Sequence, residues 1–164
     1  MCSIFSIKPP KNNLTIIKNL KSDFDATGKL IAFLIITMQH QKTNIEALIV
    51  EDEIDICYLL KGILKNKNLH TNCAGSINEA VKSLQTYTPS ILFLDNHLPD
   101  GKGIDLIGTV KRNHPQIKIV MITAHDTSDD KEKAISKGAD FFIGKPFTRE
   151  TIYNTLDVLL GKTG

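Results

Sequence analysis

Short apolar runs alternate with segments of helical periodicity from residue 45 onward, and this alternation limits the fold more than any other feature of the chain. The apolar runs lie at 46–50, 70–74, 91–94, 117–122 and 141–143. The helical segments lie at 54–66, 76–88, 104–113, 128–137 and 148–160. Continuous apolar runs are typical of parallel strands that are covered on both faces. We therefore predict an α/β fold, a doubly wound five-stranded parallel sheet of order 2-1-3-4-5 with helices on both faces.

Polar side chains follow these strands at their carboxyl ends, where ligands bind in doubly wound folds. Glu51 and Asp52 follow the first predicted strand and Asp95 follows the third, while Thr123 and Lys145 follow the fourth and the fifth. The first and third strands are neighbours in the predicted order, so their three carboxylates should converge. Such a cluster repels itself unless a hard cation binds there, and oxygen ligands suit Mg²⁺. With a lysine and a hydroxyl alongside, the pattern predicts a phosphoryl-transfer site with an aspartate as nucleophile.

Four motifs, in order and each at a strand end, resemble the receiver domain of two-component response regulators. They are Val50-Glu-Asp-Glu53, Leu94-Asp-Asn-His-Leu-Pro-Asp-Gly-Lys-Gly103, Ile122-Thr-Ala124 and Gly138-Ala-Asp-Phe-Phe-Ile-Gly-Lys-Pro-Phe147. The resemblance covers about residues 45–161 and implies a flavodoxin-like fold. In this family Asp95 corresponds to the phosphoacceptor. Glu51, Asp52 and the backbone carbonyl of His97 correspond to the groups that hold Mg²⁺ with it, although Glu51 is longer than the aspartate usual at its position.

The resemblance also implies how the phosphoryl group is held and read. Thr123 would hydrogen-bond it and Lys145 would form an ion pair with it. Phe142 takes the position of the switch aromatic, which turns inward with Thr123 and changes the face formed by 128–137, 141–143 and 148–160. Phe142 lacks the hydroxyl of the tyrosine often found there. His97 and His125 take positions that set the lifetime of the phosphoryl group.

The expected function is that of a phosphoacceptor switch, not of an enzyme with an external substrate. The implied donor is a sensor histidine kinase or a histidine phosphotransfer protein, and the output is contact with an unknown protein target or a phosphorylation-dependent homodimer. Because the chain ends soon after its last helical segment, we expect no output domain. An inactive receiver-like binding module is an alternative, opposed by the complete residue set. A second alternative is an aspartyl-phosphate phosphohydrolase, but such an enzyme would carry an acidic residue at the position of His97.

Residues 1–44 differ from the rest and hold six lysines against two aspartates. We predict a flexible N-terminal extension over 1–44, with a true translation start at Met38, followed by one receiver domain over 45–164. The apolar run 30–38 is too short to cross a bilayer, which takes about 20 residues, so no membrane insertion is expected. The alternative for this run is a surface-lying helix or a partner contact. The net charge of +2 gives no electrostatic argument for nucleic-acid binding.

The three cysteines, Cys2, Cys57 and Cys73, are odd in number and widely spaced. This pattern argues against a disulfide framework or a zinc site and favours a reducing, cytoplasmic location. We expect Cys57 and Cys73 to be small buried apolar residues rather than reactive thiols.

Overall fold

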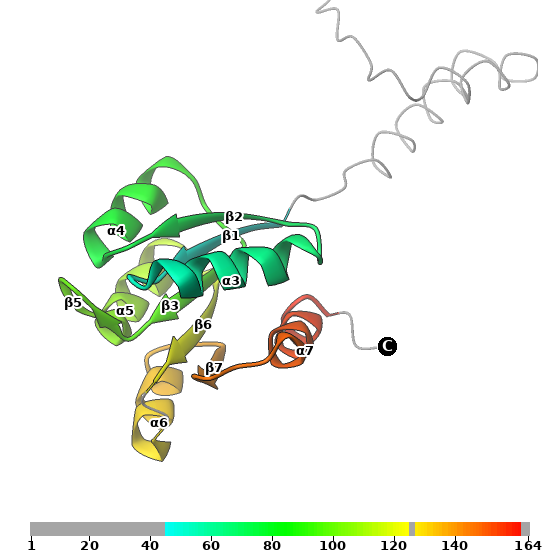
Figure 1. Ribbon diagram of the computed structural model, residues 1–164. Helices are drawn as coiled ribbons and strands as arrows, with labels where there is room; N and C mark the ends of the chain where they lie inside the picture. The colour runs from blue at the N-terminus through cyan, green and yellow to red at the C-terminus, as the bar shows by residue number, and fades with distance from the viewer. Residues whose placement is uncertain (1–44, 125–126, 162–164) are drawn as a thin grey trace, which may run out of the picture. The chain divides into compact units, whose positions relative to one another are not determined.

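The computed structural model describes residues 45–124 and 127–161. Its main sheet is parallel and five-stranded, with strands in the order β2-β1-β3-β6-β7 (Figure 1). The strands are β1 (Ile45–Val50), β2 (Leu69–Ala74), β3 (Ile91–Asp95), β6 (Lys118–Thr123) and β7 (Phe141–Gly144). Counted along the chain, these strands have the order 2-1-3-4-5. The predicted doubly wound topology is therefore confirmed.

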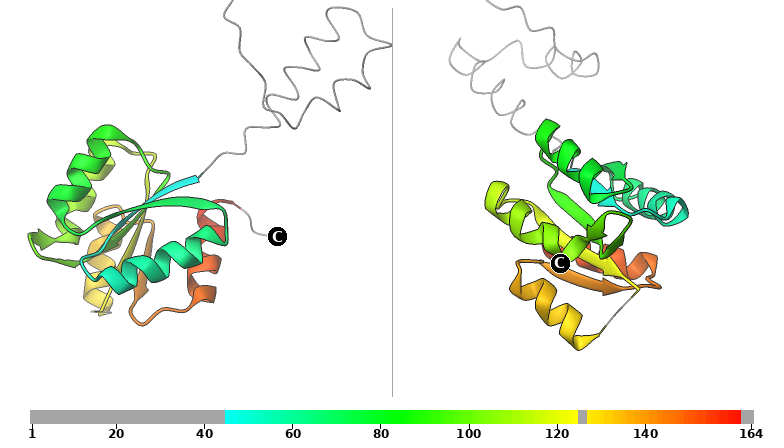
Figure 2. Two further views of the ribbon diagram at one scale, coloured as in Figure 1. Left: turned by 45° about the horizontal axis from the view of Figure 1, so that its top comes forward. Right: turned by 90° about the vertical axis from the view of Figure 1, so that its left-hand side faces the viewer.

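Five helices cover the two faces of this sheet (Figure 2). They are α3 (Ile54–Lys65), α4 (Ile77–Thr86), α5 (Gly103–Asn113), α6 (Ser128–Ser136) and α7 (Arg149–Leu159). Helices α3 and α7 pack against one face, and helices α4, α5 and α6 pack against the other. Right-handed crossovers between parallel strands produce this two-sided arrangement.

Alternate residues of each strand point into the two core layers. Leu48, Leu92 and Met121 pack with α4, α5 and α6, whereas Ile49 and Phe93 pack with α3 and α7. All five are essentially inaccessible to water. Burying a side chain of this size contributes roughly 1.5–3 kcal/mol relative to leaving it exposed. The strands are thus held firmly from both sides, which fixes the residues that follow them at the carboxyl edge.

Local sequence signals set where several elements begin and end. The Ser76 hydroxyl accepts a hydrogen bond from the Glu79 N–H at 3.2 Å and caps α4, as its position before that helix predicts. Gly138, at φ +109°, follows α6 and takes the left-handed conformation that is common just after the end of a helix. The sequence did not predict a short hairpin between β4 (His97–Leu98) and β5 (Gly101–Lys102). Two residues per strand are too few to leave a periodic pattern.

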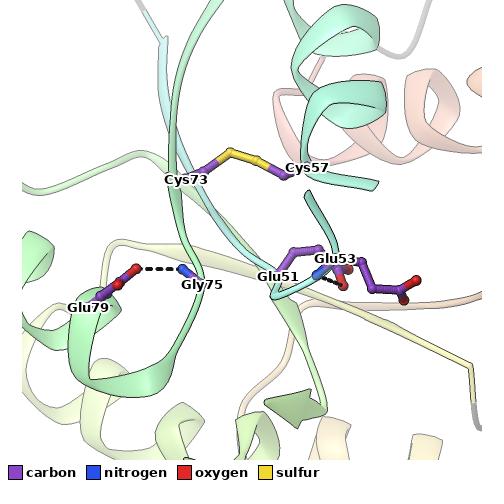
Figure 3. The surroundings of a disulfide bond; sticks show 6 residues. All are labelled: Glu51, Glu53, Cys57, Cys73, Gly75 and Glu79. Atoms are coloured by element: carbon purple, nitrogen blue, oxygen red, sulfur yellow. Dashed lines mark hydrogen bonds between the residues drawn. A yellow bond between two sulfur atoms is a disulfide. The ribbon is translucent and has the colours of Figure 1, made fainter. Parts of the chain in front are cut away.

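The expectation for two of the cysteines was wrong. A disulfide joins Cys57 of α3 to Cys73 of β2 (Figure 3). Cys57 is buried as expected, but Cys73 is exposed. Cys73 pairs with Ile49 in the sheet, and Ile49 belongs to the layer that packs on α3, so the two cysteines share one face of the sheet. That proximity depends on the strand register and is not visible in the cysteine spacing.

The predicted extension over 1–44, its start at Met38 and the apolar run 30–38 all lie outside the described residues. Within 45–124 and 127–161, no helix is long and apolar enough to cross a membrane. The division into an extension and a folded domain, and the cytoplasmic location, remain predictions.

Candidate functional site

The register of the sheet brings four strand ends to one edge. Val50 of β1 pairs with Leu94 of β3, so the residues that follow them, Glu51 and Asp95, lie side by side. Asp95 in turn pairs with Ile122 of β6, which places Thr123 next to it. The pairing of Thr123 with Gly144 puts the following residue at the same edge. That residue is Lys145.

Three carboxylates converge there. Glu51 and Asp95 are buried, with 4% and 5% of their surfaces exposed, and Asp52 is exposed. One oxygen from each of the three lies within 4.8 Å of the others. Buried carboxylates need countercharges, and a cluster of oxygen donors at this spacing suits a hard divalent cation. The three residues therefore fit Mg²⁺, as the strand-end pattern predicts.

Lys145 supplies one positive charge to this cluster. Its Nζ lies 2.7 Å from Glu51 Oε2 and 3.5 Å from Asp95 Oδ2. A further contact of 3.4 Å joins Lys145 Nζ to Glu53 Oε1. The lysine side chain is only 12% exposed. In this structure its nearest partner is thus Glu51, and Asp95 is within reach of the same ammonium group.

Burial and the charges of the site shift the pKa values of Glu51 and Lys145. Burial raises the pKa of Glu51 above its ordinary value, and the charge of Asp95 adds to the rise, although the hydrogen bond from Lys145 opposes it. Burial by itself would lower the pKa of Lys145, but the hydrogen bond to Glu51 and the charge of Asp95 outweigh it, and this pKa is raised. Lys145 therefore keeps its positive charge. This single ammonium group faces more than one carboxylate.

The other residues predicted for the site differ in their burial and in the elements that carry them. Thr123 is buried at the end of β6, and its carbonyl accepts a 2.7 Å hydrogen bond from the Lys145 N–H. His97 lies on β4 and is exposed. Phe142 pairs with Met121 in the sheet, two residues before Gly144, and is partly buried against the α4, α5 and α6 layer. His125 lies outside the described residues.

Two residues that the sequence analysis gave no role hold Asp95 in its place. The Asn96 N–H donates to Asp95 Oδ1 at 2.8 Å, and the Asn96 carbonyl and amide oxygens accept from the N–H groups of Gly103 and Ile104 at 3.0 and 3.2 Å. A Cβ at Gly103 would collide with the backbone carbonyl of Asp95. The only sequence signal for this close approach is the Gly101-Lys-Gly103 pattern, which reads simply as a loop.

Residues 47–157 match the family described as the response regulator receiver domain. The chain belongs to this family. The nitrogen assimilation regulatory protein NtrX of Azorhizobium caulinodans is 34% identical over 109 residues, which cover 65% of this chain and 24% of that protein. The response regulator protein PilR of Pseudomonas aeruginosa is 39% identical over 101 residues, 62% of this chain and 23% of PilR. The chain thus spans about a quarter of the length of these curated relatives.

Solved receiver structures share the fold. The beryllofluoride-activated receiver domain dimer of NtrC4 superimposes with a TM-score of 0.68 at 33% identity, covering 73% of this chain and 98% of that one. NtrX from Brucella abortus, solved in complex with ADP, gives a TM-score of 0.65 at 32% identity over 71% of this chain and 26% of that one. The resemblance inferred from the four motifs is therefore confirmed at the level of family and fold.

Proposed function

We propose that this receiver domain accepts a phosphoryl group on Asp95 from a phosphohistidine of a sensor kinase or a phosphotransfer protein. The observation that carries the proposal is the position of Asp95, which is buried with two further carboxylates within 4.8 Å and an ammonium at 3.5 Å. A buried carboxylate in this setting can act as an acceptor, because the Lys145 ammonium offsets part of the negative charge of the product.

The chain's own groups account for the transfer. A carboxylate oxygen of Asp95 attacks phosphorus, the bond from phosphorus to the histidine nitrogen breaks, and the electron pair stays on the imidazole. Glu51, Asp52, Asp95 and the His97 carbonyl would hold Mg²⁺, which neutralises charge on the transferring group when it is bound. Lys145 offsets part of the remaining negative charge, and the Asn96 N–H fixes one Asp95 oxygen so that the carboxylate is already oriented.

A protein partner has a surface on which to approach this site. Ile54, Tyr58 and Leu59 lie on α3, directly after the acidic segment 51–53, and are 70%, 69% and 51% exposed. Exposed apolar side chains that gather beside a site are typical of protein contacts. The phosphohistidine donor therefore has an apolar contact area next to the acceptor, which favours transfer from a docked protein.

The output proposed for the phosphorylated form is a change in the face formed by α6, β7 and α7. Thr123 would turn toward the phosphoryl group, and Phe142, only partly buried, would fill the space vacated beside β6. His97 and His125 would then tune how quickly water removes the phosphoryl group. An altered face can bind a target protein or a second copy of the chain.

The test is phosphorylation by acetyl phosphate with Mg²⁺, followed by intact mass, with Asp95→Asn beside the wild type. One added phosphoryl group on the wild type and none on the variant is the expected result. Added mass that persists in Asp95→Asn would show that a residue other than Asp95 accepts the phosphoryl group. No added mass, with no release of phosphate over time, would favour the inactive binding module. Multiple turnover of a small phosphate ester would instead favour the phosphohydrolase.

A further inference from the structure

The loop after the acceptor is attached to a helix that is distant in sequence. We define the acceptor loop as residues 96–102, which contain the β4–β5 hairpin. At its tip the Asp100 carboxylate accepts two backbone hydrogen bonds from the first turn of α4. Oδ1 accepts from the Ile77 N–H at 2.8 Å, and Oδ2 accepts from the Asn78 N–H at 2.9 Å. One side chain thus bridges two parts of the chain that are separated by 22 and 23 residues.

Helix α4 does not depend on Asp100 alone for its start. Ser76 caps the Glu79 N–H, and Glu79 Oε2 accepts from the Gly75 N–H at 2.7 Å (Figure 3). Asp100 accepts from the N–H groups of Ile77 and Asn78, which these local caps do not satisfy. The hydrogen bonds from Asn78 and Ile77 lower the pKa of Asp100 below its ordinary value, so the carboxylate stays charged at the positive end of the helix dipole.

The acceptor loop is also held at its base. The Gly103 N–H donates to the Asn96 carbonyl at 3.0 Å, and Gly103 lies against the backbone of Asp95. At the tip, Gly101 has φ +152°, and a Cβ there would lie 3.1 Å from Ile77 Cδ1, so the tip also packs closely on α4. Between these two attachments lies His97, whose carbonyl is proposed to bind the metal.

We propose that Asp100 is a positioning residue for Mg²⁺ binding: by bridging the acceptor loop to α4 it holds the His97 carbonyl toward Glu51, Asp52 and Asp95. The inference rests on the metal site in the proposed function. Without the bridge the tip loses its two hydrogen bonds to α4 and keeps only the packing of Gly101 on Ile77 and of Leu98 in the core. The carbonyl is then correctly placed for a smaller fraction of the time. The apparent dissociation constant for Mg²⁺ rises as that fraction falls. Mutation of a residue that orients a metal ligand without binding the metal itself typically lowers metal affinity about 10- to 100-fold.

The test measures Mg²⁺ affinity directly, by titration of backbone amide NMR shifts, in the wild type, Asp100→Asn and Asp100→Ala. We expect the dissociation constant to rise about tenfold in Asp100→Ala. Asn keeps one acceptor oxygen and should give a smaller rise. Asp105→Ala is the matched control, because Asp105 is also an exposed carboxylate close to the loop, but it pairs with Lys137 at 2.7 Å and not with α4. Its Mg²⁺ affinity should equal that of the wild type.

A second measurement distinguishes a role of Asp100 in positioning the metal ligand from a role in capping α4 alone. Phosphorylation by acetyl phosphate should need about tenfold more Mg²⁺ for half-maximal rate in Asp100→Ala, and saturating Mg²⁺ should restore the rate. A variant that melts at a lower temperature but binds Mg²⁺ like the wild type would overturn the proposal, as would a wild type that binds no Mg²⁺. If Mg²⁺ binds and depends on Asp100 but no phosphorylation occurs, the phosphoacceptor function fails while the positioning role stands.

Discussion

At the scale of single residues, one lysine balances a buried carboxylate whose neighbours are also acidic. Lys145 Nζ is 2.7 Å from Glu51 Oε2, and the Glu51 side chain is almost fully buried. Water cannot replace the ammonium at that depth, so loss of the lysine leaves a desolvated charge. Lys145 therefore has an effect on stability that can be measured apart from any role with the phosphoryl group.

Lys145→Gln is expected to lower the free energy of unfolding at pH 7 by about 3 kcal/mol, because Glu51 is left buried without a countercharge. The measurement is urea denaturation in buffer without Mg²⁺. The double variant Glu51→Gln/Lys145→Gln should recover a large part of the loss, since the carboxylate that lost its partner is then neutral. If the double variant is as unstable as the sum of its single variants, the pair does not interact as its geometry indicates.

At the scale of elements, the start of α5 must approach β3 closely. Gly103→Ala is expected to lower the free energy of unfolding by about 1–3 kcal/mol and to slow phosphorylation, because the added Cβ collides with the Asp95 carbonyl and the backbone must shift. Gly108→Ala is the matched control within the same helix. The nearest atom to a Cβ there is 3.6 Å away, at the end of the Arg112 side chain, so alanine should stabilise α5 by roughly 0.5–1 kcal/mol. Equal effects of the two substitutions in denaturation curves would contradict the close approach.

A second carboxylate joins α5, β6 and the start of β7. Asp140 accepts from Lys111 Nζ at 2.6 Å, from Lys118 Nζ at 3.1 Å and from the Ile119 N–H at 2.9 Å. Burial alone would raise the pKa of Asp140, but these three donors, with Lys111 the strongest, outweigh burial and lower it. Since the pKa in the folded state lies below that in the unfolded chain, the carboxylate stabilises the fold above the unfolded pKa, and this contribution is lost as pH falls through the folded value.

Asp140→Asn should therefore be less stable than the wild type near pH 7. The gap should close in acid as the pH falls through the lowered pKa of Asp140 in the folded state, below which Asp140 is protonated in both states. Urea denaturation of both proteins across this range measures the gap. Asp157→Asn is a suitable control because Asp157 pairs with Lys67 at 3.1 Å on a more exposed surface, where an ion pair contributes little. A gap that is independent of pH would show that Asp140 acts through packing rather than charge.

The elements that sequence reasoning predicted well are those with strong local signals. Continuous apolar runs indicated β3 and β6 because both faces of these strands are buried, and the helical segment from residue 76 indicated the position of α4. The β4–β5 hairpin left no such signal. The bridge from Asp100 and the preference of Lys145 for Glu51 were also missed, because both depend on side-chain positions across elements that are distant in sequence. The strand order alone was enough to bring the three carboxylates together.

At the scale of the whole molecule, the acidic site lies at one edge of the sheet, and Phe142 lies in one of the two helical layers. The residues of the site lie at the carboxyl edge, while Phe142 packs on the side of α4, α5 and α6. Strands β6 and β7 connect the two, because Thr123 ends one strand and Lys145 follows the other. Strand β6, which is buried on both faces, and the partly buried strand β7 therefore connect the site to that layer.

On the opposite layer, the disulfide between Cys57 and Cys73 ties α3 to the edge strand β2. The two cysteines are 16 residues apart. A cross-link that closes a loop of this length lowers the conformational entropy of the unfolded chain and so stabilises the fold by about 3 kcal/mol. Reduction with dithiothreitol should therefore lower the free energy of unfolding by about that amount, measured by urea denaturation with and without reductant. Cys57→Ala/Cys73→Ala is the control and should not respond to reductant. Thiol titration of the unfolded protein should count two more thiols after reduction. An unchanged count would mean that the cysteines are neighbours without a bond, and the stability of the wild type would then be independent of reductant as well.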